Sequence, residues 1–129
     1  MRRTMPFNYT ISANEVAELI AQNQSFVLNI VASWCPDCTE AQFPHTEQFR
    51  ALLNEVDIEF YNLVAQEVKG EFLSPLHEAL VESAGGHGYP RTTLWINGVL
   101  RENEHVEVTE LDDLIALGTH FVQVVNTAS

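Results

Sequence analysis

The feature that most constrains this chain is an apolar run leading directly into two cysteines. The run, Phe26–Ala32, is flanked by polar residues and predicts a central strand covered on both faces. Cys35 and Cys38 follow within a few residues, and Pro36 between them suits the first position of a helix. The sequence therefore predicts a strand, a short turn and a helix that begins at the first cysteine.

This arrangement favours a reactive thiol at the start of the helix. Unpaired backbone N–H groups and the partial positive charge of a helix N-terminus stabilise a thiolate at Cys35. Cys38 lies one turn further along, close enough to attack a mixed disulfide formed at Cys35. The pair therefore predicts thiol–disulfide chemistry.

A zinc site is the alternative interpretation of two cysteines at this spacing. The chain has no second cysteine pair to complete such a site. Histidines would have to supply the other ligands, and these are scattered without metal-ligand spacing: His45, His77, His105 and His120. We therefore expect no metal and no cofactor other than a redox-active Cys35–Cys38 disulfide.

Hydrophobic periodicity and turn residues predict the other elements. The predicted helices cover Ala13–Asn23, a long segment from Pro36 to Val56 kinked at Pro44, a segment from Ser74-Pro75 to Gly85-Gly86, and a final helix capped at Thr109–Asp112. The predicted strands are Ile58–Val64, Thr92–Ile96 and Val99–Glu102, the last two joined by a turn at Asn97-Gly98. On the final helix, Leu111, Leu114, Ile115, Phe121, Val122 and Val125 are expected to face inward. This order predicts an α/β fold with a parallel strand pair joined to an antiparallel hairpin.

Two motifs far apart in the sequence resemble those of the thioredoxin family. The first is Trp34-Cys35-Pro36-Asp37-Cys38, and the second is Gly88-Tyr89-Pro90, which precedes the predicted hairpin. The resemblance covers Ile11 to Val125. It implies a single thioredoxin-like domain over residues 1–129, with residues 1–10 as an irregular N-terminal segment. It also implies a central mixed sheet, built from a βαβ unit and a hairpin and flanked by helices.

The resemblance implies a role for each motif residue. Cys35 corresponds to the attacking thiol and Cys38 to the resolving thiol. Trp34 corresponds to the aromatic residue that shields the site, and Pro90 to a cis proline beside the disulfide. The backbone of Tyr89 would pair with an extended substrate segment.

The sequence departs from the family at the central strand. Asn29 stands where thioredoxins place a buried acid, and an amide cannot accept the proton of the resolving thiol as a carboxylate does. The family's lysine in the next strand has no counterpart among Phe60, Tyr61 and Asn62. The segment between the two motifs is also longer than in a plain thioredoxin, around Gly70 to Gly86. We therefore expect a divergent member.

Three further residues are expected to modulate the thiols. Pro36 and Asp37 form the dipeptide between the cysteines, and the charge of Asp37 disfavours a thiolate at Cys35. A poorly stabilised thiolate makes the dithiol the better reductant. Asp37 itself is expected to point to solvent. Arg91 either offsets Asp37 or attracts an acidic substrate, or else is an ordinary solvated strand residue.

The charge of −12, from 18 acidic and 6 basic side chains, argues against nucleic acid and anionic membranes as partners. No secretory signal or membrane-spanning stretch is visible, so we expect a soluble, cytoplasmic protein. The partners expected are disulfide-containing proteins, with a thioredoxin reductase or glutathione as electron donor.

Three functions remain open from the sequence. The favoured one is a thiol–disulfide oxidoreductase that reduces protein disulfides. The second is a binding or chaperone module that keeps the fold while redox turnover is incidental, an idea prompted by Asn29 and the longer middle segment. The third is a glutaredoxin-like, glutathione-dependent reductase, for which Cys35-Pro36-Asp37-Cys38 is suggestive.

Overall fold

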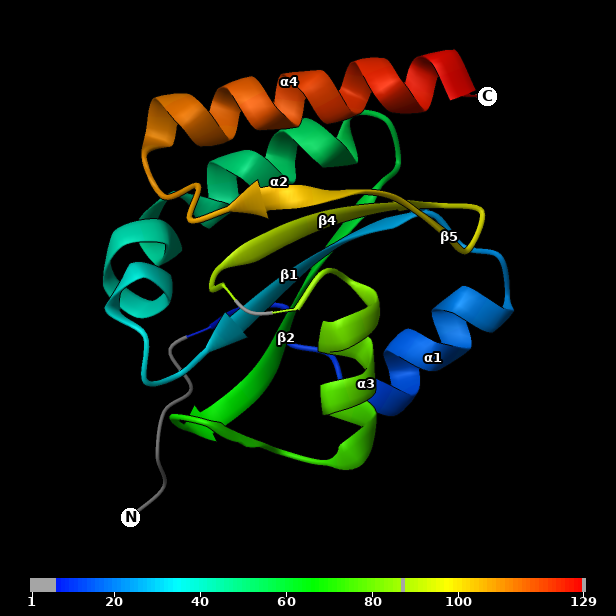
Figure 1. The fold of residues 1–129 in the computed structure, drawn as a ribbon. Coiled ribbons are helices and arrows are strands. Elements are labelled where there is room, and N and C mark those ends of the chain that lie inside the picture. The colour runs from blue at the N-terminus through cyan, green and yellow to red at the C-terminus, as the bar shows by residue number, and fades with distance from the viewer. Residues whose placement is uncertain (1–6, 87, 129) are drawn as a thin grey trace.

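A computed structural model describes residues 7–86 and 88–128 (Figure 1). Its helices are α1 (Ala13–Ala21), the π-helix η1 (Asp37–Gln42), the 3-10 helix η2 (Phe43–His45), α2 (Thr46–Asn54), α3 (Pro75–Ser83) and α4 (Leu111–Ala128). Its strands are β1 (Phe26–Ala32), β2 (Glu59–Val68), β3 (Glu71–Phe72), β4 (Arg91–Ile96) and β5 (Val99–Val106). Residues 1–6 of the predicted irregular N-terminal segment lie outside the described residues. In residues 7–10 regular structure is limited to an isolated bridge from Thr10 to Asn62, while Phe7 is buried in the core.

The five strands form one sheet in the order β3-β2-β1-β4-β5. β1 runs parallel to β2 and antiparallel to β4, and β4 pairs antiparallel with β5. This confirms the predicted mixed sheet, with β1 in its centre. All seven residues of β1 are buried, as its unbroken apolar sequence predicted.

Helices cover both faces of the sheet (Figure 1). On one face α1 and α3 pack through Val16, Leu80 and Val81. On the other face α2 and α4 pack through residues that include Phe49 and Phe121. Burial of β1 between these two layers fixes the direction in which the chain leaves the strand toward the cysteines. Among the described residues, no helix combines the length and apolar character needed to cross a membrane.

The predicted long helix after the cysteines is three successive segments, η1, η2 and α2. Pro44 lacks an N–H, and its ring clashes with the carbonyl group four residues earlier, so an α-helical ladder cannot continue through it. The backbone instead forms a π-helical turn before Pro44 and a 3-10 turn around it. The predicted kink is therefore confirmed as a change of helix type.

The other differences from the predicted elements concern the lengths of strands and the buried face of α4. β2 extends to Val68 and β5 to Val106, further than predicted, and β3 was not predicted. On α4, Ile115 is 38% exposed, so its predicted inward orientation is wrong. The buried stripe follows the spacing i, i+3, i+4, i+7 and consists of Leu114, Leu117, Gly118 and Phe121. Ile115 falls beside that stripe, where nothing covers it fully.

The predicted turn at Asn97-Gly98 docks on the end of α1. The Gly98 N–H donates to the Gln24 carbonyl at 2.8 Å, and a Cβ at Gly98 would lie 2.5 Å from the Ile20 carbonyl oxygen. Gly98 also has φ +77°, a conformation that L side chains rarely adopt. Both the backbone conformation and the close approach therefore require glycine here.

We expect Gly98→Ala to lower the free energy of unfolding by about 2–4 kcal/mol, because left-handed strain and overpacking add. Gly70→Ala is the matched control: Gly70 has φ +87° but open space around it, so only about 1 kcal/mol should be lost. Urea unfolding measures both. Equal losses in the two variants would contradict the close approach at Gly98.

Candidate active site

The two cysteines lie where β1 ends and η1 begins. The Cys35 N–H donates to the Ala32 carbonyl at 3.2 Å, and the Cys35 carbonyl accepts the N–H groups of Cys38 at 3.0 Å and Thr39 at 3.1 Å. Pro36 is exposed and caps η1 with φ −62°. These bonds form the first helical turn and confirm that a helix begins at the cysteine pair. Both cysteines are free thiols.

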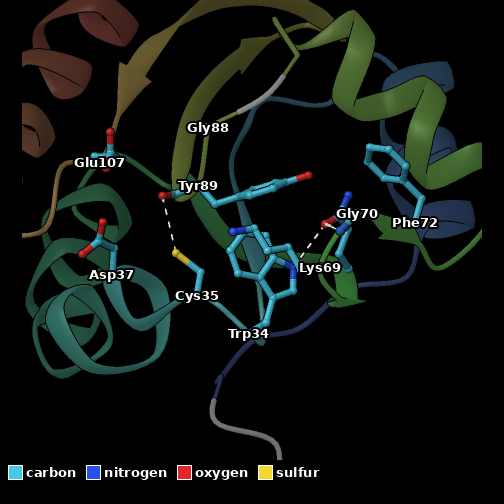
Figure 2. A pocket seen from close by; sticks show the side chains of 10 residues that line it. Trp34, Cys35, Asp37, Lys69, Gly70, Phe72, Gly88, Tyr89 and Glu107 are labelled. Atoms are coloured by element: carbon cyan, nitrogen blue, oxygen red, sulfur yellow. Dashed lines mark hydrogen bonds between the residues drawn. The ribbon is translucent and has the colours of Figure 1, made fainter.

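The two thiols differ in access. Cys35 is 8% exposed, whereas Cys38 is 0% exposed. The Cys35 Sγ donates to the Tyr89 carbonyl oxygen at 3.7 Å (Figure 2). Cys35 lines a pocket in the surface, and Cys38 does not. A substrate in that pocket would therefore meet Cys35 first.

Burial raises the pKa of the Cys38 thiol far above its ordinary value. A hydrogen bond with the Ala32 backbone opposes this shift, while the neighbouring Cys35 and the charge of Asp37 add to it. Cys38 therefore remains protonated at neutral pH in the dithiol state. A group that accepts its proton is needed before it can act as a nucleophile.

The second motif lies beside Cys35, as predicted, through the Tyr89 carbonyl oxygen that accepts the Cys35 S–H. The Tyr89–Pro90 peptide bond is cis, and both residues are buried. The Tyr89 ring packs edge-on against Trp34, with ring centroids 5.9 Å apart. The Tyr89 hydroxyl is buried without a hydrogen-bond partner among the described residues, and burial raises its pKa. A neutral, rigidly held aromatic pair thus stands next to Cys35.

The pocket beside Cys35 has a volume of about 430 Å³. Trp34, Phe72 and Tyr89 are its aromatic residues, and Asp37 and Glu107 lie on the Cys35 side (Figure 2). Asp37 is half-buried and lines this open pocket, so its side chain is partly covered and the expectation that it points to solvent is only partly met.

The opposite wall comes from the end of β2 and from β3. The Gln66 Oε1 accepts the Trp34 indole N–H at 3.1 Å and the Gly70 N–H at 2.9 Å, so it holds the indole to the β2–β3 turn. The Lys69 ammonium lies 5.3 Å from the centre of the Trp34 ring, in a cation–π contact. Gly70 and Phe72 complete this wall. The start of the longer segment between the two motifs, around Gly70, therefore lines the pocket.

This wall of the pocket was not predicted from the sequence. Its members are Gln66, Lys69, Gly70 and Phe72, joined on the other side by Glu107. The Lys69-Gly70 pair after Val68 was the one signal that could have indicated a turn at this place. Nothing in the sequence links these positions with Trp34.

The position of Arg91 differs from what was predicted for it. It is only 9% exposed and does not line the pocket, so it is neither a solvated strand residue nor placed to attract a substrate. Its Nη1 donates to the Asn103 carbonyl at 2.6 Å. A Cβ at Gly85 would lie 2.8 Å from the same nitrogen, so the loop before Tyr89 rests on this guanidinium. Arg91 therefore supports the loop that precedes Tyr89.

Asn29 is fully buried at the centre of a hydrogen-bonded amide network. Its Nδ2 donates to the Gln42 Oε1 at 2.7 Å and to the Asn62 Oδ1 at 2.9 Å. Its Oδ1 accepts the Thr92 hydroxyl at 2.8 Å. Asn62 and Thr92 are the residues directly opposite Asn29 on β2 and β4. The amide therefore serves the network, and none of these bonds reaches Cys38.

The fold has clear counterparts among solved structures. Mitochondrial thioredoxin 3 of Saccharomyces cerevisiae, in its oxidised form, is 18% identical with a TM-score of 0.61, over 91% of this chain and 94% of that chain. The oxidised thioredoxin of Plasmodium falciparum is 16% identical with a TM-score of 0.64, over 88% and 98%. The thioredoxin of Fasciola hepatica is 16% identical with a TM-score of 0.57, over 85% and 94%.

The chain is therefore a thioredoxin-fold protein with a divergent sequence, as the two motifs predicted. No protein-family model and no curated protein matches it. Because one structural neighbour is mitochondrial, the cytoplasmic location stays a prediction.

In the reduced protein only Cys35 is expected to react rapidly with iodoacetamide near neutral pH, because Cys38 is buried and protonated. Mass spectrometry of the labelled peptides over time measures both rates, and unfolded protein is the control in which both cysteines label. Similar rates for the two cysteines in the folded protein would contradict the assignment.

Proposed function

We propose that the protein is a thiol–disulfide oxidoreductase that reduces disulfides of protein substrates through Cys35 and Cys38. The observation that carries this proposal is the unequal placement of two adjacent thiols. Cys35 lines an open pocket beside a cis-proline loop, while Cys38 is inaccessible one turn away. Such a pair suits one thiol that meets the substrate and a second that releases it.

The reaction begins when the Cys35 thiolate attacks one sulfur of the substrate disulfide. A mixed disulfide forms, and the other substrate sulfur leaves as a thiolate that takes up a proton. Cys38 then loses its proton and attacks the Cys35 sulfur, so that the Cys35–Cys38 disulfide forms and the second substrate sulfur leaves. Two electrons and two protons pass to the substrate. A dithiol donor, or two molecules of a monothiol such as glutathione, then restores the protein.

The Tyr89 carbonyl oxygen links thiol chemistry to substrate binding. In the dithiol state it accepts the Cys35 S–H. Ionisation of Cys35 removes that donor, and the carbonyl oxygen becomes available to a backbone N–H of an extended substrate segment. Trp34 and Tyr89 supply apolar surface beside it. Binding and activation of Cys35 therefore favour each other.

The surroundings of Cys38 favour a reductase over an oxidase. Burial and the charge of Asp37 both disfavour a thiolate at Cys38, so the dithiol form gains no stabilisation from a Cys38 thiolate. A strong oxidant of this kind depends on a stabilised reduced form. We therefore expect reduction of substrates as the favoured direction.

The test is reduction of insulin disulfides, with NADPH and thioredoxin reductase in one arm and glutathione with its reductase in the other. We expect turnover in the wild type and none in Cys35→Ser. Turnover only with glutathione would indicate the glutaredoxin-like alternative. No turnover in either arm, with insulin aggregation suppressed equally by Cys35→Ser, would overturn the proposal in favour of a binding module.

Trapping separates the two thiols within the same reaction. Cys38→Ser should accumulate a mixed disulfide with insulin, whereas Cys35→Ser should form none, because only Cys35 lines the pocket. Non-reducing electrophoresis detects the adduct. An adduct of Cys35→Ser through Cys38 would reverse the assigned roles.

The substitution Asn29→Asp tests whether the absence of a buried acid at this position slows the Cys38 step. A carboxylate at this position should speed the Cys38 step, and stopped-flow measurement of mixed-disulfide decay measures it. It should also lower stability by about 3 kcal/mol, because a charge is buried without a cationic partner. Burial raises the pKa of such a carboxyl in the folded state, so the deficit should grow as the pH rises above the unfolded value of about 4.

Asn62→Asp is the matched control, since Asn62 is 1% exposed and belongs to the same network one strand away. It should lose similar stability without accelerating the decay. If Asn29→Asp leaves the decay unchanged or slower, Cys38 does not need an acid at position 29.

A further inference from the structure

Three potential metal ligands converge where β5 meets α4. The Glu102 carboxylate lies 2.7 Å from the His105 Nε2 and 2.9 Å from the His120 Nε2. One ligand atom from each of the three residues lies within 4.8 Å of the other two. Glu102 and His105 belong to β5, and His120 belongs to α4. None of the three lines the pocket at Cys35.

A β-bulge brings the two strand residues together. Residues three apart on a regular strand point to opposite faces of the sheet. Here His105 pairs with Thr92 and Glu102 with Leu94, so β5 uses one residue more than β4 over this interval. The extra residue restores a common face for Glu102 and His105, on the side covered by α4. The backbone irregularity therefore builds the cluster.

The cluster has an apolar floor and an open side. The Phe121 ring packs against both imidazoles, with centroid distances of 5.5 Å to His105 and 6.0 Å to His120. The side chains of Glu102 and His105 are 16% and 22% exposed, whereas that of His120 is 48% exposed. Phe121 thus orients the two rings, and solvent reaches the cluster beside His120.

We propose that Glu102, His105 and His120 bind a divalent transition-metal ion of the zinc type. Two imidazole nitrogens and one carboxylate oxygen are a common set of three protein ligands for zinc, with water in a fourth position. Tetrahedral bonds of about 2.0–2.1 Å place the ligand atoms about 3.4 Å apart. The two printed separations, 2.7 and 2.9 Å, are shorter than that value, and all three ligand atoms lie within 4.8 Å of one another, so small side-chain rotations would admit the ion in place of the present hydrogen bonds.

The ligand chemistry discriminates among cations. Calcium and magnesium prefer six or more oxygen ligands, and the cluster offers one carboxylate. Imidazole nitrogens instead favour zinc and its neighbours in the first transition series. A bound ion would join the edge strand β5 to α4, and its effect should appear as stability, independently of the thiols.

The test is zinc binding by calorimetry and thermal unfolding with zinc or with EDTA. The Cys35→Ser/Cys38→Ser double variant is used throughout, so that the thiols do not compete for the metal. We expect one zinc ion per chain and a higher melting temperature with zinc. His120→Ala in this background should weaken zinc binding about a hundredfold, because loss of a hydrogen-bond partner of a metal ligand already weakens binding by about 10–100-fold. It should also abolish the rise in melting temperature with zinc.

His45→Ala is the matched control, because His45 is half-buried in η2 and outside the cluster. It should bind zinc as the double variant does. Glu102→Gln should weaken binding as well, with unfolding in EDTA confirming that each variant folds. Binding weaker than about 100 μM, or binding unchanged in His120→Ala, would overturn the proposal.

Discussion

The structure depends on the burial of β1 between two apolar layers. Because every residue of this strand is covered, its ends are fixed by the sheet, and the chain leaves it at one defined place. The polar side chain of Asn29 in its middle is tolerated because neighbouring strands and η1 supply all its partners. The position of Cys35 beside the Tyr89 carbonyl follows from this anchoring.

Burial and nearby negative charge both disfavour a thiolate at Cys38. Asp37 and Glu107 place negative charge on the Cys35 side of the pocket, and Lys69 lies across the Trp34 ring on the other. Burial keeps Cys38 neutral. The uncharged network at Asn29 adds no base, so proton removal from Cys38 is expected to limit the second half of the proposed reaction.

The sheet carries two centres of different chemistry. The thiols lie at the carboxyl end of the central strand, while the Glu102 cluster lies on the edge strand β5 under α4. The edge strand is free to bulge because only one neighbour constrains it, and the bulge aligns two side chains. β1 pairs on both sides, and the one register irregularity in its ladders falls at its end, between Val31 and Ala32.

The sequence by itself determined β1, the helix caps at Ser12 and Ser74, the hairpin turn at Asn97-Gly98 and the motif at Tyr89-Pro90, because each depends on residues close together in the chain. The resemblance to thioredoxins also placed Asn29 at a buried position, and the structure confirms its burial. Only the tertiary structure decided the pocket wall at Lys69 and Phe72, the burial of Arg91 and the cluster at His120. These depend on strand register, a bulge and the packing of distant segments, which no local pattern specifies.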